Sequence, residues 1–274
     1  MIHLIVDSTF GIEEQFAKEK GIEVVNLKLI LDDEVRDEGF EKDWGDFYNK
    51  LEASKSFPTT SQPSPEDFKD AIKRVLQRDE NAQILILTIT QSLSGTINSA
   101  TLAAKSFENE NIIALDSKTG TAGGRILVEE LVELIEGGAC FEEVINQTKI
   151  IQEQIQVDFI PETMEYLKRG GRIGTLSATL ASILKIKPIF RFKNGVVTVA
   201  KKVLGLSRAV GDMVMQVPKT FKKIYLLYIH KAENIEILKE KVSTILGIKE
   251  PKVLALEPVF GAHVGIGAVG IASL

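Results

Sequence analysis

Two short segments rich in hydroxyl side chains have the residue types and spacing to bind an anion. The first, Ser92–Thr96, follows an apolar run over 82–90 that is typical of a buried strand. Where such a strand opens into a helix, backbone N–H groups and hydroxyls point outward, which suits a phosphate or a carboxylate. The second segment, Thr59–Ser64, lies upstream of the first. Together they predict a site for a small acidic ligand.

Ser94 also fits two other interpretations. The first is structural, because its hydroxyl could cap the helix that we predict over 95–107. The second is a serine-dependent hydrolase of small esters, with Ser94 as the nucleophile and His263 as the base. Residues 92–95 lack the first glycine of the G-x-S-x-G nucleophile elbow, which weighs against a hydrolase. A regulatory module that binds a sugar or a phosphate remains a third interpretation of the same hydroxyls.

A basic segment interrupted by two glycines, Arg169–Arg172, follows a predicted helix over 162–168. Glycine beyond the C-cap and basic residues in the last turn are typical of a helix end. The same Arg169 and Arg172 could equally clamp an anion or dock an acidic partner. The glycines of 265–270 match G-x-G-x-x-G, but no helix and no ribose-binding acid can follow them, so we expect no nucleotide there.

The composition argues against several other classes of protein. The net charge of −5 does not favour a nucleic-acid partner. The sequence contains no run of eighteen apolar residues, so we expect no membrane span. The N-terminus lacks the features of a signal peptide, and the single cysteine, Cys140, excludes an internal disulfide. We therefore expect a cytoplasmic protein. His, Cys and carboxylates are not clustered as metal ligands, so no metal and no cofactor is expected.

Strand-like and helix-like patterns alternate through the first half of the chain. We predict strands over 2–6, 24–31, 84–89 and 112–115, and helices over 12–20, 44–51, 65–76, 95–107 and 123–135. Such alternation is typical of a parallel sheet covered by helices on both faces. Ser64, followed by Pro65 and two acids, has the residues of a well-formed helix start.

The second half has a different pattern. We predict helices over 141–155, 162–168, 180–186 and 234–246, strands over 157–160, 223–229 and 253–256, a hairpin over 189–199 that turns at Asn194-Gly195, and a last strand after the glycines of 265–270. The fold class predicted is therefore α/β with two domains, an N-terminal parallel α/β sandwich over 1–156 and a C-terminal α+β domain over 157–274. A ligand cleft is expected at their junction.

Six segments, in order, resemble the DegV family of fatty-acid-binding proteins, which includes the acyl-carrier subunits of bacterial fatty acid kinase. Any one of them is a weak signal, but together they extend over essentially the whole chain. The segments are Ile5–Thr9, Pro58–Pro65, Ser92–Ala100, Glu165–Ile173, Ile186–Ile189 and Gly261–Ala268.

The resemblance implies that the chain encloses one long-chain fatty acid, with the carboxylate at the domain junction and the tail inside the C-terminal domain. The carboxylate would then be held near Thr60, Ser61, Ser94, Gly95 and His263. The residues that would line the tail are Ile173, Leu176, Leu180, Ile183, Leu184, Ile186, Ile189 and Phe190.

The resemblance also implies a partner and no catalytic nucleophile of the chain's own. A separate ATP-binding kinase subunit would phosphorylate the carboxylate. Arg169 and Arg172 lie at positions that, in family members, resemble an edge for docking a partner. Two parts of the sequence, one single position and one short segment, depart from the family. Leu204 stands where relatives often carry an arginine, and Gly123–Arg125 differs from the usual small and apolar residues.

Overall fold

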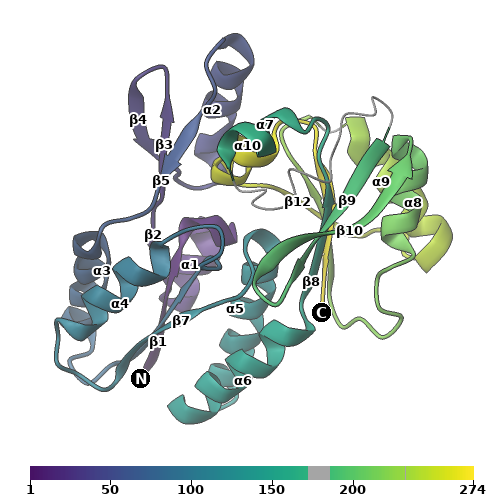
Figure 1. The fold of residues 1–274 in the computed structure, drawn as a ribbon. Coiled ribbons are helices and arrows are strands. Elements are labelled where there is room, and N and C mark those ends of the chain that lie inside the picture. The colour runs from purple at the N-terminus through teal and green to yellow at the C-terminus, as the bar shows by residue number, and fades with distance from the viewer. Residues whose placement is uncertain (172–185, 232) are drawn as a thin grey trace.

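A computed structural model describes residues 1–171, 186–231 and 233–274, and within these ranges the chain forms three sheets (Figure 1). Two of the sheets are large and are flanked by helices, and the third is a small sheet between residues 28 and 61. The predicted α/β fold class is confirmed.

The first sheet is parallel throughout and has the strand order β2-β1-β6-β7. Its strands are β1 (Ile2–Asp7), β2 (Glu23–Val25), β6 (Gln83–Thr88) and β7 (Ile112–Asp116). One face packs on α3 (Pro65–Arg78) and α4 (Thr96–Lys105), and the other packs on α1 (Glu14–Lys20) and α5 (Thr121–Glu136). Burial on both faces explains why the strand patterns of this half are almost continuously apolar. Ser64 caps α3 as predicted, because its hydroxyl accepts from the N–H of Asp67.

The small sheet corrects the prediction of a single strand over 24–31. The chain leaves the first sheet after β2 and forms β3 (Lys28–Leu31), which pairs antiparallel with β4 (Glu34–Asp37) and β5 (Thr59–Ser61). The break falls at Leu27, whose N–H donates to the hydroxyl of Ser8 and whose carbonyl accepts from Glu38. At Leu27, these bonds take the place of the backbone hydrogen bonds between strands of the first sheet. Helix α2 (Glu41–Ala53) joins β4 to β5.

The six-stranded sheet has the order β10-β9-β8-β13-β11-β12 and is mixed, because only β11 and β12 run parallel. Its strands are β8 (Gln156–Ile160), β9 (Ile186–Lys193), β10 (Val196–Leu204), β11 (Ile224–Tyr228), β12 (Lys252–Ala255) and β13 (Val269–Ser273). The predicted hairpin turn is confirmed, because Asn194 and Gly195 both have positive φ. Helices α8 (Leu206–Val214) and α9 (Glu233–Leu246) pack on one face of this sheet.

Short helices complete the second half. Helix α7 (Glu165–Gly170) follows β8, and α10 (Pro258–Val264) precedes β13. No helix was predicted over 258–264, because a seven-residue helix is too short to show a period. Of the helix predicted over 180–186, residues 180–185 lie outside the described residues, and Ile186 begins β9 instead.

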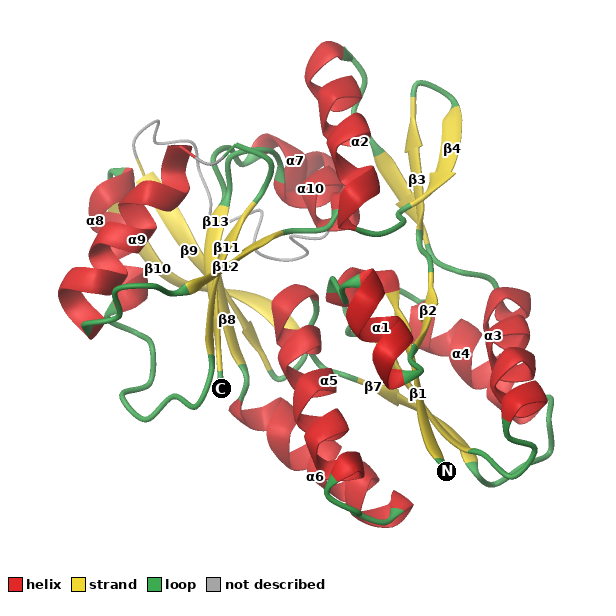
Figure 2. Ribbon diagram, turned by 180° about the vertical axis from the view of Figure 1, so that it is seen from behind, coloured by secondary structure: helices red, strands yellow, loops and turns green. Residues whose placement is uncertain are grey.

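Helices α5 and α6 (Phe141–Gln154) lie between the two large sheets (Figure 2). The largest apolar core is shared, since it includes Leu85 of the first sheet and Phe159 of the six-stranded sheet. The domain boundary after Gln156 remains a prediction. Within the described ranges, no helix combines the length and the apolar character that a membrane crossing requires.

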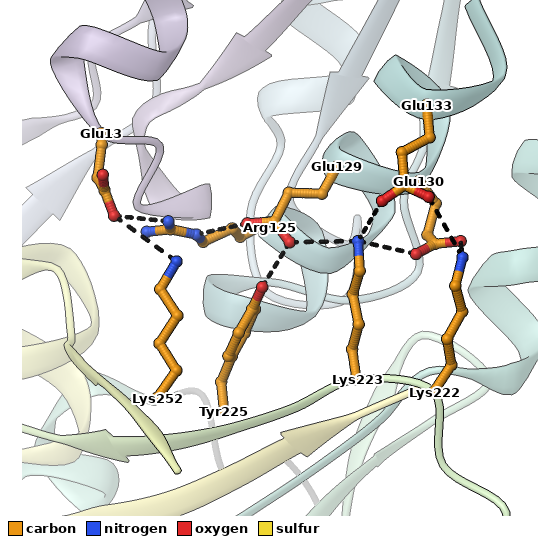
Figure 3. A network of polar contacts seen from close by, with 9 residues as sticks. All are labelled: Glu13, Arg125, Glu129, Glu130, Glu133, Lys222, Lys223, Tyr225 and Lys252. Carbon is orange, nitrogen blue, oxygen red and sulfur yellow. Dashed lines mark hydrogen bonds and ion pairs between the residues drawn. The ribbon is translucent and has the colours of Figure 1, made fainter. Parts of the chain in front are cut away.

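A polar network also joins the two halves, and we call it the ionic seam (Figure 3). Arg125 of α5 donates to Glu13 at 2.6 Å, to Glu129 at 3.0 Å and to the carbonyl of Gly11. The hydroxyl of Tyr225 on β11 donates to Glu129 at 2.6 Å. The nine residues of the seam are Glu13, Arg125, Glu129, Glu130, Glu133, Lys222, Lys223, Tyr225 and Lys252.

Candidate functional site

A cavity of about 320 Å³ lies between the two halves of the chain. Its walls come from β5, the β6–α4 loop, β8, β9, β10, α7 and α10, so residues far apart in the sequence enclose one space. The volume falls at the lower end of the range of small-molecule sites, roughly 300–1,000 Å³. The predicted hydroxyl segments both reach the wall, through Thr60, Ser61, Ser94 and Gly95.

The apolar part of the wall is largely aromatic. Phe159 and Phe190 stack with their ring centroids 5.2 Å apart, and Phe192 lies 6.4 Å from Phe159 and from Phe260. All four rings line the cavity together with aliphatic side chains such as Val197. Space bounded by such side chains favours an apolar group, because filling it removes apolar surface from water.

The polar part of the wall contains a hydrogen-bonded pair of side chains that are far apart in the sequence. The hydroxyl of Thr60 on β5 lies 2.8 Å from Nε2 of His263 on α10, although 203 positions separate them in the chain. Both side chains line the cavity. His263 is packed tightly from behind, since a Cβ on Gly170 would lie 2.6 Å from its Nδ1. Only glycine fits at position 170 without moving the imidazole.

Ser94 does not act as the helix cap considered above. The N-cap of α4 is Gly95, which has no side chain, and the hydroxyl of Ser94 lies 2.8 Å from that of Thr96. The first N–H groups of a helix have no acceptor within the helix, so the start of α4 offers donors beside the cavity. For the hydrolase hypothesis, the hydrogen bonds pair Ser94 with Thr96 and His263 with Thr60 rather than a nucleophile with a base.

Gln62 is a cavity residue that the sequence did not single out. Its amide donates to the hydroxyl of Ser99 at 3.0 Å, which joins the strand β5 to helix α4. A Cβ on Gly95 would lie 2.3 Å from Oε1 of Gln62, so a larger residue there would displace the Gln62 side chain. Gln62 thus holds the first hydroxyl segment against helix α4.

Of the residues that the resemblance predicts to line the tail, one lines the cavity, others do not, and the rest lie outside the described ranges. Phe190 lines the cavity, whereas Ile189 lies on the opposite face of β9 and packs in the core with Val210 and Met213. This corrects the prediction for Ile189, since successive side chains of a strand point to opposite faces. Ile186 is not among the lining residues. Five predicted residues lie outside the described ranges, namely Ile173, Leu176, Leu180, Ile183 and Leu184.

The alternation of side chains along strand β9 could have identified one more residue of the cavity wall. Phe192 is two positions from Phe190 on the same strand and lines the cavity with it. Phe159 and Phe260 carried no such signal, because their position depends on how β8 and α10 pack against this hairpin. Aromatic residues in buried segments look alike in a sequence, whether they line a cavity or a solid core.

The basic segment lies at the edge of the cavity region. Helix α7 ends before Gly171, whose φ of +68° is typical of a C-cap, as the structural interpretation predicted. The guanidinium of Arg169 lies 3.9 Å from the ring centroid of Phe57 and pairs with Glu165 at 3.0 Å. Arg172 lies outside the described residues, and Leu204 is exposed on β10. Docking by these residues remains a prediction.

Three buried carboxyl groups lie behind the cavity wall and were not predicted. Burial raises the pKa of Asp7 to about 6 and that of Glu38 to about 8, and it raises the pKa of Glu257 well above its usual range. Across residues 1–171, 186–231 and 233–274, no group of three or more His, Cys, Asp or Glu side chains has an arrangement that could hold a metal ion.

Comparisons with known proteins place the chain in a family. Residues 1–274 match the sequence model of a family described as "Uncharacterised protein, DegV family". A DegV domain-containing protein of Clostridium acetobutylicum is 29% identical over 275 residues, covering 98% of this chain and 97% of the relative.

Solved structures agree with this assignment. A DegV family protein of Thermus thermophilus, described for its fatty acid binding, has a TM-score of 0.87 and 30% identity over 99% of this chain and 98% of its own. DegV of Bacillus subtilis, described as a fatty acid binding protein, has a TM-score of 0.82 and 26% identity over 99% and 98% of the two chains. The chain belongs to the DegV family.

Proposed function

We propose that this chain binds one long-chain fatty acid in the cavity between its two halves. The observation that carries the proposal is the division of the cavity wall, with aromatic and aliphatic side chains over most of it and hydroxyls with one imidazole at one part. The descriptions of the relatives from Thermus thermophilus and Bacillus subtilis as fatty acid binding support it.

The polar part of the wall suits a carboxylate. Thr60 and Ser94 would donate from their hydroxyls, the first N–H groups of α4 would add backbone donors, and His263 would hold Thr60 in place. Ser61 and Gly95 complete this part of the wall. None of the described wall residues is a lysine or an arginine, so the bound carboxylate would keep its negative charge unpaired and remain reactive toward a phosphoryl donor.

The apolar part of the wall would supply most of the affinity. Burying about fifteen methylene groups at roughly 0.8 kcal/mol each gives about 12 kcal/mol. Association and ordering remove several kcal/mol of that gain, which still leaves tight binding. Each hydroxyl contact with the carboxylate adds about 1–3 kcal/mol and mainly fixes its orientation.

We further propose that the chain is a carrier without catalysis of its own, acting in the cytoplasm with a separate ATP-binding kinase subunit. The motifs that resemble acyl carriers of fatty acid kinase support this role, and Leu204 is the departure that bears on docking. Mixing the loaded protein with such a subunit and ATP should yield acyl phosphate. No product with a subunit that is active on its own carrier would contradict the partnership.

Binding itself is tested on the purified protein. Denaturing mass spectrometry should release a co-purified long-chain fatty acid, and repeated preparations without one would contradict the proposal. Thr60→Val removes the hydroxyl while keeping the side-chain shape, and we expect affinity for oleic acid to fall by about 1–3 kcal/mol. Thr59→Val is the matched control, because Thr59 is exposed on the same strand and does not line the cavity.

A further inference from the structure

A buried polar cluster, formed by Asp7, Ser8 and Glu38, lies behind the cavity. The side chains of Asp7 and Glu38 are fully buried, and Ser8 is only 4% exposed. Asp7 and Ser8 follow one another at the end of β1, while Glu38 comes from the loop between β4 and α2. The hydroxyl of Ser8 and the carboxyl of Asp7 both lie close enough to Glu38 to influence its pKa, so the three side chains form one cluster.

Each member of this cluster holds the backbone of a residue that lines the cavity. The N–H of Leu27 donates to the hydroxyl of Ser8 at 2.9 Å, and the N–H of Ile89 donates to Oδ2 of Asp7 at 2.7 Å. The N–H of Val259 donates to Oε1 of Glu38 at 2.6 Å. These three wall residues belong to separate segments: Leu27 follows β2, Ile89 follows β6, and Val259 lies in the first turn of α10.

The position of His263 depends on the same cluster. Val259 and His263 both lie on α10, a helix of seven residues whose first turn is bound by Glu38. The segment before it is held as well, because the hydroxyl of Tyr48 donates to the carbonyl of Leu256 at 2.9 Å. Glu38 therefore connects the small sheet to the helix that presents the imidazole to Thr60.

We infer that Asp7, Ser8 and Glu38 are positioning residues of the fatty-acid site, and that Glu38 acts as a neutral carboxylic acid. This inference rests on the proposed function. It assigns a role to the buried acids, which touch neither the cavity space nor the expected ligand, and it makes binding sensitive to alkaline pH.

The charges around Glu38 explain why it must be neutral. Asp7 and Glu257 face it as carboxyl groups and Tyr48 as a phenol, while the cation Arg125 acts on Glu257. Its second oxygen, Oε2, is buried without a hydrogen-bond partner among the described residues. An ionised carboxylate there would be a buried charge close to Asp7, which is strongly unfavourable.

The direction of the pH effect follows from the raised pKa. At pH 7 Asp7, with a pKa of about 6, is mainly ionised, and Glu38, with a pKa of about 8, is mainly protonated. The contribution of Glu38 to stability is complete below its ordinary pKa of 4.5 and is lost as the pH rises through 8. Above that pH, repulsion between Asp7 and Glu38 should disturb Ile89 and Val259 in the wall.

The test compares oleic acid binding by the wild-type protein and by Glu38→Gln between pH 7 and 9.5. Glutamine keeps an oxygen for the N–H of Val259 and cannot ionise. We expect wild-type affinity to fall about tenfold over this range and the affinity of Glu38→Gln to stay level. Glu34→Gln, at an exposed position of β4, is the control and should follow the wild-type profile. Identical profiles for wild type and Glu38→Gln would overturn the neutral-acid role.

A second variant tests positioning. Glu38→Ala removes the acceptor, and we expect about a tenfold or greater loss of affinity already at pH 7, restored in Glu38→Gln. Unchanged affinity would overturn the positioning role. Amide exchange of Val259 gives a readout that needs no ligand, because its protection should fall in Glu38→Ala and persist in Glu38→Gln. If the wild-type protein bound no oleic acid while exchange changed as expected, the proposed function would fail and the positioning of α10 would stand.

Discussion

The cavity and the ionic seam both join the N-terminal and C-terminal halves of the chain, but they do so with opposite chemistry. The cavity wall is mainly apolar and leaves about 320 Å³ of space, whereas the seam pairs four carboxylates with four cations and one phenol (Figure 3). Lys223 bonds to Glu130 at 2.8 Å and to Glu133 at 3.0 Å, and these contacts raise its pKa against the effect of burial.

The difference shows how one junction serves two requirements. Charged groups need close, specific partners, so a network such as the seam fixes the geometry of the elements that carry it. Apolar side chains pack without direction, so they can border a space whose shape an alkyl chain would complete. We therefore expect substitutions in the seam to change stability, and substitutions in the cavity to change binding.

The largest effect is expected at Arg125, whose side chain is 7% exposed and holds two glutamates and a carbonyl. Arg125→Met should lower the free energy of unfolding by about 3 kcal/mol, because it removes the ion pair of the largely buried Glu129 and the buried donor to the carbonyl of Gly11. Urea denaturation measures the change. Arg74→Met, which removes an exposed ion pair with Glu23, is the control and should cost less than about 1 kcal/mol. Equal losses in the two variants would remove the distinction between the seam and an ordinary surface pair.

An intermediate effect is expected from filling the cavity. Val197 lines it from β10, and Val197→Trp should occupy the space and weaken oleic acid binding by at least about tenfold, because a filled site must be overpacked to admit a ligand. Thermal unfolding should change little. Val196→Trp places the same side chain at the exposed neighbouring position and should bind as the wild type does. Normal binding by Val197→Trp would show that the ligand lies elsewhere.

The smallest effect is expected at the outer end of the seam. Lys252 and Glu13 lie 4.0 Å apart and are each about half exposed. Lys252→Met should change the free energy of unfolding by less than about 1 kcal/mol, since solvent screens such pairs. A double-mutant cycle with Glu13→Gln, measured at low and high salt, reports the coupling. A coupling as large as the effect of Arg125→Met would mean that the seam acts as one unit along its whole length.

Much of the fold could be predicted because its signals are local. Apolar periodicity located β1, β6, β7 and most helices, Ser64 marked the start of α3, and Asn194-Gly195 marked the hairpin turn. The split between β2 and β3 was missed because its cause, the bonding of Leu27 to Ser8 and Glu38, is not local. The face of β9 that carries Ile189 was missed for the same reason.

The sequence by itself determined which groups were available: hydroxyls after a buried strand, a histidine between glycines and an ordered set of family segments. Tertiary structure alone decided that Thr60 meets His263, that Phe190 rather than Ile189 faces the cavity, and that Asp7 and Glu38 are buried together. The physical reason is range. Propensity and periodicity act over a few residues, whereas a cavity and a shifted pKa arise from segments that come together only when the sheets pack.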